Sequence, residues 1–186
     1  MAKLPGRFEG LDDSQWNFRK LLLVCPCESL PLSLFTRAIQ PKYDWSFSGD
    51  PITRDPDELG IPRWLRNAFR PSSDDRWPKT SDARLVAELQ AEGVVEIAWK
   101  NTTKHVRVSS TYRHSEPIPD DEYRKVFFQF VRCVIHALPL RYTDILEDEI
   151  WLQLREVIED FVFPTLGVLS DKELAYCLDG VGFDGL

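Results

Sequence analysis

The sequence predicts a mainly helical α+β fold, on three observations. Residues 120–138 and 144–163 each repeat apolar side chains at the spacing of an amphipathic helix. The short connection between them predicts that these two long helices pack as antiparallel neighbours. Residues 95–108 alternate apolar and polar side chains on both sides of a central turn, which indicates a β-hairpin. We therefore expect five or six helices, including the long antiparallel pair, and a hairpin that can widen into a small three-stranded antiparallel sheet.

Length and composition favour one globular domain. A chain of 186 residues with 43% apolar residues can bury a sizeable core. We place this domain at residues 12–179 and expect flexible ends at residues 1–11 and 180–186. The apolar run at residues 21–24 is far shorter than a signal sequence or a membrane span, so we expect a cytoplasmic protein that does not enter a membrane.

Two helices are expected near the N-terminus. Asp13 or Ser14 provides an N-cap for a helix that runs to about Val24. Pro31 suits the start of a second, shorter helix, and Pro41 ends it. The second helix carries mainly apolar side chains, which indicates packing in the core, and neither helix suggests chemistry.

A Cys-Pro-Cys sequence, Cys25 to Cys27, lies between these two helices. It offers one closely spaced pair of metal ligands, whereas a structural metal site usually combines two such pairs. Free cysteine also behaves as a small apolar side chain that is commonly buried. We therefore expect buried, reduced thiols and no bound metal.

Residues 41–83 combine a short strand, loops and one short helix. Residues 43–47 alternate aromatic and polar side chains, so we expect a strand that can join the hairpin. Residues 49–61 are rich in proline, glycine and aspartate, which indicates a long irregular loop. Arginine and tryptophan, the types most enriched at binding hot spots, cluster in and after the helix that Pro62 begins. This candidate partner-binding cluster, with a solvated helix face as its alternative, comprises Arg63, Trp64, Arg66, Arg70, Arg76 and Trp77.

The next helix and the hairpin allow the most specific structural prediction. Residues 80–81 can cap a helix that Gly93 ends. A register that pairs Val95 with Val108 matches apolar to apolar and charged to charged along both strands. This register centres the turn on residues 101–102.

The run Arg84-Leu-Val-Ala-Glu-Leu-Gln-Ala-Glu-Gly93 and the hairpin after it resemble the recognition helix and wing of winged-helix proteins, including MarR-like regulators. The resemblance implies a nucleic-acid-binding regulator that uses residues 80–111. In such a protein the start of the helix faces the major groove and the wing carries further cations. The residues so implied are Ser81, Asp82 and Arg84 on the helix, and Lys100, Lys104 and Arg107 along the wing.

The negative charge of the chain is concentrated in its last third. Residues 115–186 hold 6 Lys/Arg against 15 Asp/Glu, a balance of −9, while residues 1–114 hold 17 against 15, a balance of +2. The face of the second long helix opposite its apolar stripe is either a solvated surface or a docking site for a basic partner. Its candidate partner-binding residues are Glu149, Leu152, Glu156, Glu159 and Asp160.

The sequence therefore favours a non-enzymatic interaction protein, such as a regulator, inhibitor or adaptor, that binds a protein partner through charge-segregated surfaces. A winged-helix nucleic-acid binder is the alternative, and a pI near 5.0 weighs against it because phosphate binding needs positive charge. An enzyme that uses His105 or His114 with a carboxylate is a third hypothesis. We recognise no catalytic or cofactor motif and expect no catalytic residue, metal or cofactor.

Overall fold

The computed structural model describes residues 11–25, 27–45, 48–58, 60–69, 84–100, 102–113, 117–138, 147–167 and 170. The ends expected to be flexible, apart from Leu11, lie outside these ranges. So do several residues of the expected sites: Arg70, Arg76, Trp77, Ser81, Asp82 and His114.

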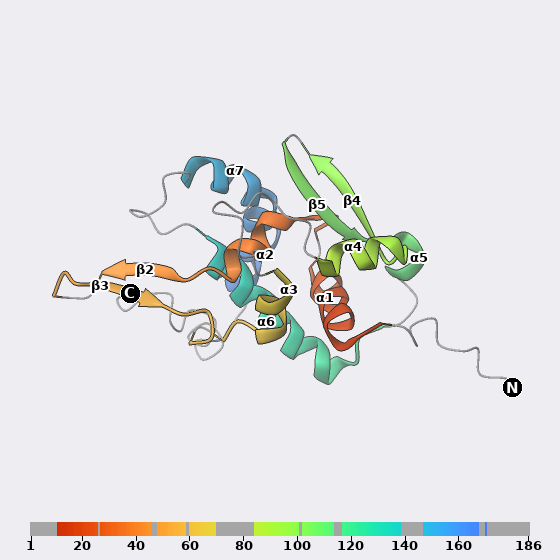
Figure 1. Ribbon diagram of the computed structural model, residues 1–186, viewed down its shortest axis with the longest axis horizontal. Helices are drawn as coiled ribbons and strands as arrows, with labels where there is room; N and C mark the ends of the chain where they lie inside the picture. The colour runs from red at the N-terminus through yellow and green to blue at the C-terminus, as the bar shows by residue number, and fades with distance from the viewer. Residues whose placement is uncertain are drawn as a thin grey trace, which may run out of the picture.

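Helices make up most of the described structure, and a small antiparallel sheet lies beside them (Figure 1). The helices are α1 (Asp13–Val24), α2 (Leu32–Ala38), α3 (Arg63–Phe69), α4 (Arg84–Ala91), α5 (Ser110–Arg113), α6 (Asp120–Ala137), α7 (Glu147–Val157), the π-helical turn η1 (Ile158–Val162) and α8 (Phe163–Leu166). The strands are β1 (Leu30–Pro31), β2 (Lys42–Trp45), β3 (Pro51–Arg54), β4 (Val95–Lys100) and β5 (Thr103–Val108). The mainly helical α+β fold is thus confirmed. Within the ranges given above, no helix combines the length and the apolar character needed to cross a bilayer.

The N-terminus of α1 is closed by a capping box that begins one residue before the expected cap. The Asp12 carboxylate accepts hydrogen bonds from the backbone N–H groups of Ser14 and Gln15, both at 2.8 Å. The Gln15 side chain accepts one from the Asp12 N–H at 2.9 Å. This reciprocal arrangement needs Glu or Gln three residues after the cap. A cap at Asp13 would place Trp16 there, and so the helix begins after Asp12.

The end of α4 and the register of the hairpin follow the sequence. Gly93 has a φ of +72° and closes α4 with its N–H bonded to the Gln90 carbonyl, while the Val94 N–H bonds to the Leu89 carbonyl. In the hairpin, β4 and β5 pair antiparallel with Val95 opposite Val108, as predicted. Helix α4 therefore leads directly into β4.

The sheet has three strands, in the order β1-β5-β4, but its third strand is not the one expected. The two-residue strand β1 pairs with β5, with Leu30 opposite Val106. Residues 43–47 do not join the hairpin: β2 pairs with β3 in a separate two-stranded ribbon that extends away from the helices (Figure 1). The prediction of an irregular loop over residues 49–61 is wrong in part, because residues 51–54 form β3. Pro51 lies opposite Trp45 at the first position of this strand, where proline is tolerated.

The core is centred on α6, which packs against α1 and α2. Phe130 and Val134 on α6 are fully buried. An aromatic cluster joins α1, α2 and α3: the ring centroids of Phe18 and Phe35 are 4.9 Å apart, and Phe69 lies 5.3 Å and 5.5 Å from them. This packing fixes the positions of α1 and α6 relative to each other.

The second long helix is interrupted where the sequence predicts a continuous one. Helix α7 ends at Val157 and the chain continues through the π-helical turn η1 into α8. Phe161 of η1 packs edge-to-face on α6, with ring centroids 5.6 Å from Phe127 and 5.0 Å from Phe130. The C-terminal part of the described chain is thus anchored on α6 through the π turn.

Candidate functional site

A groove with a volume of about 520 Å³ lies where α1, α6 and η1 meet. Leu23 comes from the last turn of α1, Tyr123 and Phe127 come from α6, and Phe161 and Pro164 come from the C-terminal segment. The groove is open to solvent, and its walls are mainly apolar. Such a shape suits a segment of another chain better than an enclosed small molecule.

The aromatic wall of the groove follows from helical spacing. Tyr123 and Phe127 lie one turn apart on α6 and their rings stack, with centroids 6.3 Å apart. Phe127 is held from below by Phe161, which is buried. Tyr123 at the outer end remains 43% exposed. A large aromatic side chain that is half solvated beside a groove is the kind of residue that anchors a partner.

The π-helical turn η1 contributes two adjacent side chains to the groove. A π-helical turn takes more residues than an α-helical turn, so it shifts the positions that follow relative to the α7 stripe. Asp160 and Phe161, adjacent in sequence, both line the groove as a result. The carboxylate is exposed while the aromatic ring is buried.

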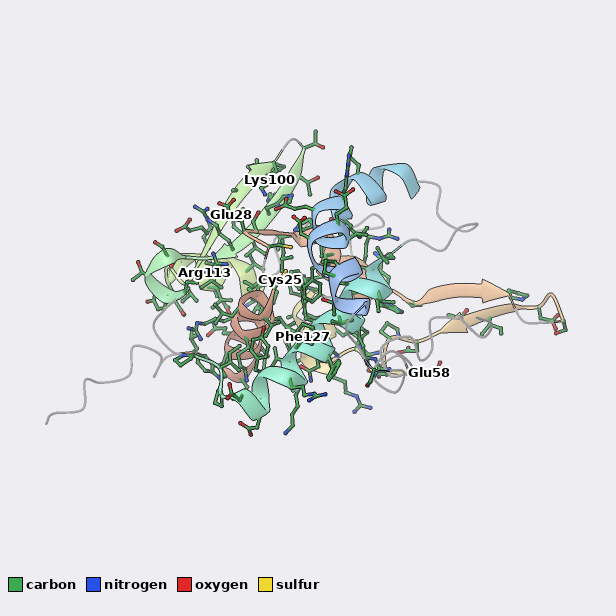
Figure 2. All side chains as sticks on the ribbon, turned by 180° about the vertical axis from the view of Figure 1, so that it is seen from behind. Cys25, Glu28, Glu58, Lys100, Arg113 and Phe127 are labelled. Atoms are coloured by element: carbon green, nitrogen blue, oxygen red, sulfur yellow. The ribbon has the colours of Figure 1, made fainter. Side chains whose placement is uncertain are left out.

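Two opposite charges border the groove. Arg113, at the end of α5, and Asp160 of η1 both line it. Both side chains are exposed, and neither has an ion-pair partner in the part of the chain that the structure describes. In Figure 2, Arg113 lies toward the edge of the molecule at α5, while Cys25 and Phe127 lie near its middle. Both charges are therefore available to a bound segment.

The cations of the β4–β5 hairpin are in a different situation, because carboxylates of this chain already engage them. Lys100 pairs with Glu156 of α7 at 3.0 Å (its position on the hairpin is labelled in Figure 2). Arg107 bridges Glu96 at 2.8 Å and Glu28 at 2.9 Å. The hydrogen bond from Arg107 to Glu96 and the charge of that carboxylate raise the pKa of Arg107 above its ordinary value.

The two remaining cations of the winged-helix alternative are also engaged. Arg84 pairs with Glu88 one turn along α4, with 2.6 Å between Nε and Oε1, which raises the pKa of the guanidinium. Lys104 lies over the ring of Trp99, its cross-strand neighbour, at 5.4 Å from the ring centroid. Trp99 itself is 63% exposed, since the hairpin extends beyond the core at this point.

The carboxylates expected to form one face of the second long helix occupy separate environments. Glu156 turns to the hairpin and pairs with Lys100, while Glu159 pairs with Arg155 at 2.8 Å. Asp160 lies at the groove. Leu152 is 69% exposed, and the Glu149 side chain lies outside the described part of the structure. The four side chains that the structure describes therefore lie in different environments.

The described members of the arginine and tryptophan cluster stabilise the loop before α3. Arg66 bridges Asp55 at 3.0 Å and Asp57 at 2.8 Å, and Arg63 lies 3.8 Å from Asp57 with most of its side chain exposed. Trp64 is half-buried and packs on the core. Arg66 therefore has a structural role that the sequence alone does not reveal.

The loop before α3 is also held against α6. Gly60 has a φ of +68°, in the left-handed region that favours glycine. A Cβ atom there would collide with the guanidinium of Arg132, which packs against the loop from α6. The close approach explains why glycine occupies this position.

His105 lies in the interior, away from the groove. The side chain is buried, its Nδ1 lies 3.3 Å from the Ser29 hydroxyl, and it does not line the groove. Burial, followed by the positive charge of Lys100, lowers the pKa of His105, so the ring is neutral at pH 7. The described residues contain no cluster of three or more side chains suited to hold a metal.

Sequence reasoning missed the groove, although part of its signal was present. The spacing of Tyr123 and Phe127 is visible in the sequence as part of the apolar stripe of α6. The position of Asp160 depends on the π turn, and the sequence carries no recognised signal for that turn. A groove formed by three distant segments needs their packing to be known.

Comparison with known proteins does not assign the chain to a class: no family model matches it, and neither a curated protein nor a solved structure is significantly similar to it. We therefore infer function from the geometry of this chain. Two surfaces differ in this geometry. The open groove has two charges without ion-pair partners among the described residues, whereas the charges of the hairpin are paired.

Proposed function

We propose that the protein is a non-enzymatic interaction protein that binds a segment of a partner protein in the groove between α1, α6 and η1. The observation that carries this proposal is an open, mainly apolar groove that is lined by the half-exposed Tyr123 and by Arg113 and Asp160, two opposite charges with no ion-pair partner among the described residues. Regulators, inhibitors and adaptors all act through such surfaces.

The chemistry of the groove supports an amphipathic helix as its occupant. Tyr123, Phe127 and Pro164 offer an apolar surface to aliphatic or aromatic anchors spaced along one helix face. A basic residue of the partner can meet Asp160, and an acidic one can meet Arg113. Burial of an aromatic contact at the centre would provide most of the affinity, and the two charges would fix the direction of the bound segment.

A displayed library of random peptides tests this proposal without a named partner. The full chain is used to select peptides, and their affinity is measured by fluorescence anisotropy. Tyr123→Glu places a charge in the groove, and Leu152→Glu places the same charge on the exposed face of α7 as a matched control. Selected peptides should carry apolar anchors and bind Tyr123→Glu at least roughly tenfold more weakly than wild type, with Leu152→Glu unchanged.

Two outcomes would contradict the proposal. One is that no peptide is enriched. The other is that the selected peptides bind Tyr123→Glu as tightly as wild type while circular dichroism shows both variants folded. A loss of binding in Leu152→Glu instead would favour the α7 surface expected from the sequence.

A winged-helix nucleic-acid binder is a second candidate, supported by one observation. Strand β1, which lies between α1 and α2, pairs with β5 and completes a three-stranded sheet with the hairpin that follows α4. This arrangement agrees with the resemblance of α4 and the hairpin to a recognition helix and wing. The paired state of Arg84, Lys100 and Arg107 weighs against it, because each would have to leave a carboxylate to contact a phosphate.

A salt titration of duplex binding decides between the two candidates. A nucleic-acid binder loses affinity steeply with salt as counterions are released, and it weakens further when Lys100, Lys104 and Arg107 are changed to Ala. We expect neither effect. Steep salt dependence that the triple variant reduces would support the winged-helix function.

A further inference from the structure

The two edges of the three-stranded sheet differ in how well they are protected. At one edge lies β1, which has only two residues and includes Pro31. At the other edge lies β4, which has six residues and no proline (Figure 1). Short length and proline are common means by which proteins prevent a sheet edge from pairing with another chain. The outer edge of β4 has neither, and no strand of the described ranges pairs with it.

The hydrogen-bond pattern of the hairpin shows which residues of β4 offer their backbone at this edge. In an antiparallel pair, residues that bond to the partner strand alternate with residues that do not. The Ser109 N–H donates to the Val94 carbonyl at 2.9 Å, in continuation of the β4–β5 register. Every second residue from Val94 onward therefore bonds to β5. The N–H and C=O groups of Val95, Ile97 and Trp99 point outward.

The side chains of these three residues form one apolar stripe that leaves the core toward the end of the hairpin. Val95 is buried, Ile97 is partly buried against the core, and Trp99 is 63% exposed. They share one face of the strand because strand side chains alternate in direction. An edge with outward-facing backbone groups and exposed apolar side chains is suited to the addition of another strand.

Strand β4 is complementary to itself in one antiparallel register. When Ile97 lies opposite Trp99 of a second copy, the two-fold axis passes between the two Ala98 residues. Ala98 is small and exposed, which suits a position where two strands approach closely. In this register Glu96 lies opposite Lys100 of the second copy. Each Trp99 ring would then cover an Ile97 side chain of the other copy.

The charged residues of β4 can keep their present partners in such a pair. Within each copy, Glu96 pairs with Arg107 and Lys100 pairs with Glu156. Across the new contact, these four groups would form a row of alternating sign. Such charges act on the register more than on the affinity. The affinity would come from the backbone hydrogen bonds and from the burial of Trp99.

We infer that the β4 edge is a homodimerisation surface, through which two copies of this chain join antiparallel into one continuous sheet. The sheet would have six strands, three from each copy. A single pair of short strands buries less than the roughly 1,000 Å² expected of a stable interface, so the dimer is weak and forms at micromolar concentrations. No residue of β4 lines the groove of the proposed function, and the two surfaces are therefore independent.

Sedimentation velocity of the full chain tests the dimer, at concentrations from about 1 μM to about 500 μM and with dithiothreitol present. The sedimentation coefficient should rise with concentration. Trp99→Lys removes the ring and places a cation in the contact, so it should weaken dimerisation at least roughly tenfold. Leu152→Lys makes the same change at an exposed apolar residue of α7 and should dimerise as the wild type does.

A charge exchange tests the register. Glu96→Lys and Lys100→Glu each place like charges opposite one another in a homodimer, so each variant alone should dimerise more weakly than wild type. When the two variants are mixed, opposite charges meet at both positions. The mixture should therefore dimerise more tightly than either variant alone.

Ala98→Cys provides a measurement that does not depend on weakened variants. Residues opposite each other in a non-hydrogen-bonded pair have Cα atoms about 4.5 Å apart, within the range of a disulfide. Mild oxidation should link two copies through position 98, as mapped by mass spectrometry.

Three outcomes would overturn the inference. The first is a wild-type chain that remains a monomer over the whole concentration range. The second is equal dimerisation of wild type and folded Trp99→Lys. The third is a mixture of the two charge variants that associates no better than each alone, together with no disulfide at position 98. If a variant fails to fold by circular dichroism, the wild-type concentration series still decides whether the dimer exists.

Discussion

The β4–β5 hairpin and the groove of this protein differ in whether their charged side chains are paired within the chain. On the hairpin, Lys100 and Arg107 are matched by carboxylates of β4, of α7 and of the loop before β1. At the groove, Arg113 and Asp160 lie beside apolar side chains without such partners in the described structure. The comparison indicates that an abundance of cations in one segment does not make it a binding surface. What matters is whether the fold leaves the charges available.

The pairing also explains why the two surfaces differ in what they can bind. An exposed ion pair contributes little stability, about 0–1 kcal/mol, but it offsets the positive charge that a phosphate or an acidic partner encounters. The cations of the hairpin are largely neutralised for this reason. The groove combines aromatic area with available charge, which is the usual composition of a binding hot spot.

The largest expected effect is the loss of folding stability when Phe161, in the wall of the groove, is changed to Ala. Phe161→Ala removes the ring that η1 packs against Phe127 and Phe130 and should lower the free energy of unfolding by about 3–5 kcal/mol, as for other buried phenylalanines. Urea denaturation measures it. Tyr123→Ala, at the exposed end of the same wall, is the control and should cost less than about 1 kcal/mol. Equal costs for both would show that η1 is not anchored on α6 as described.

A smaller effect is expected from His105 as the pH falls. Burial lowers its folded pKa, while the unfolded chain has the ordinary value of about 6.5. Below about pH 6.5 the unfolded state therefore binds a proton that the native state does not, and stability falls until the pH reaches the folded pKa, with a slope of at most about 1.4 kcal/mol per pH unit. Above that window the protonation of His105 contributes nothing to the pH dependence of stability.

The His105 prediction is measured by comparing urea denaturation of the wild type and His105→Asn at about pH 7.5 and pH 5.5. The wild type should lose more stability than the variant over this interval. Lys100 and Glu156, whose charges also act on the pKa of His105, are present in both proteins. Parallel pH dependence would mean that His105 is not held neutral by burial.

The smallest effect compares the charges of the two surfaces directly. A double-mutant cycle on Lys100 and Glu156, with each changed to Ala, should give a coupling energy of about 0.5–1 kcal/mol, because both side chains are partly exposed. The same cycle on Arg113 and Asp160 should give no coupling within error. Equal coupling in both cycles would erase the distinction between paired and available charges.

Some of the fold could be predicted from the sequence because local rules determine it. The register of β4 and β5 follows from matching apolar and charged residues, and the end of α4 follows from Gly93 in a left-handed conformation. The position of β1 could not be predicted, since a two-residue strand has no periodicity. It lies between α1 and α2 in the chain and pairs with β5 in the folded structure.

The candidate site was less accessible to sequence reasoning. A regular helical wheel places the carboxylates after Val157 on one face, but the π turn moves Asp160 to the groove and leaves Glu159 paired with Arg155. This feature arises from tertiary packing that overrides local pattern.

Backbone amide chemical shifts, followed while a selected peptide is titrated into the full-length protein, test the central claim most directly. The claim is that the groove between α1, α6 and η1 binds a partner segment. We predict that the perturbed amides cluster at the end of α1, in the first half of α6 around Tyr123, and in η1 around Asp160. Perturbations confined to the β4–β5 hairpin or to α7 around Leu152 would contradict it.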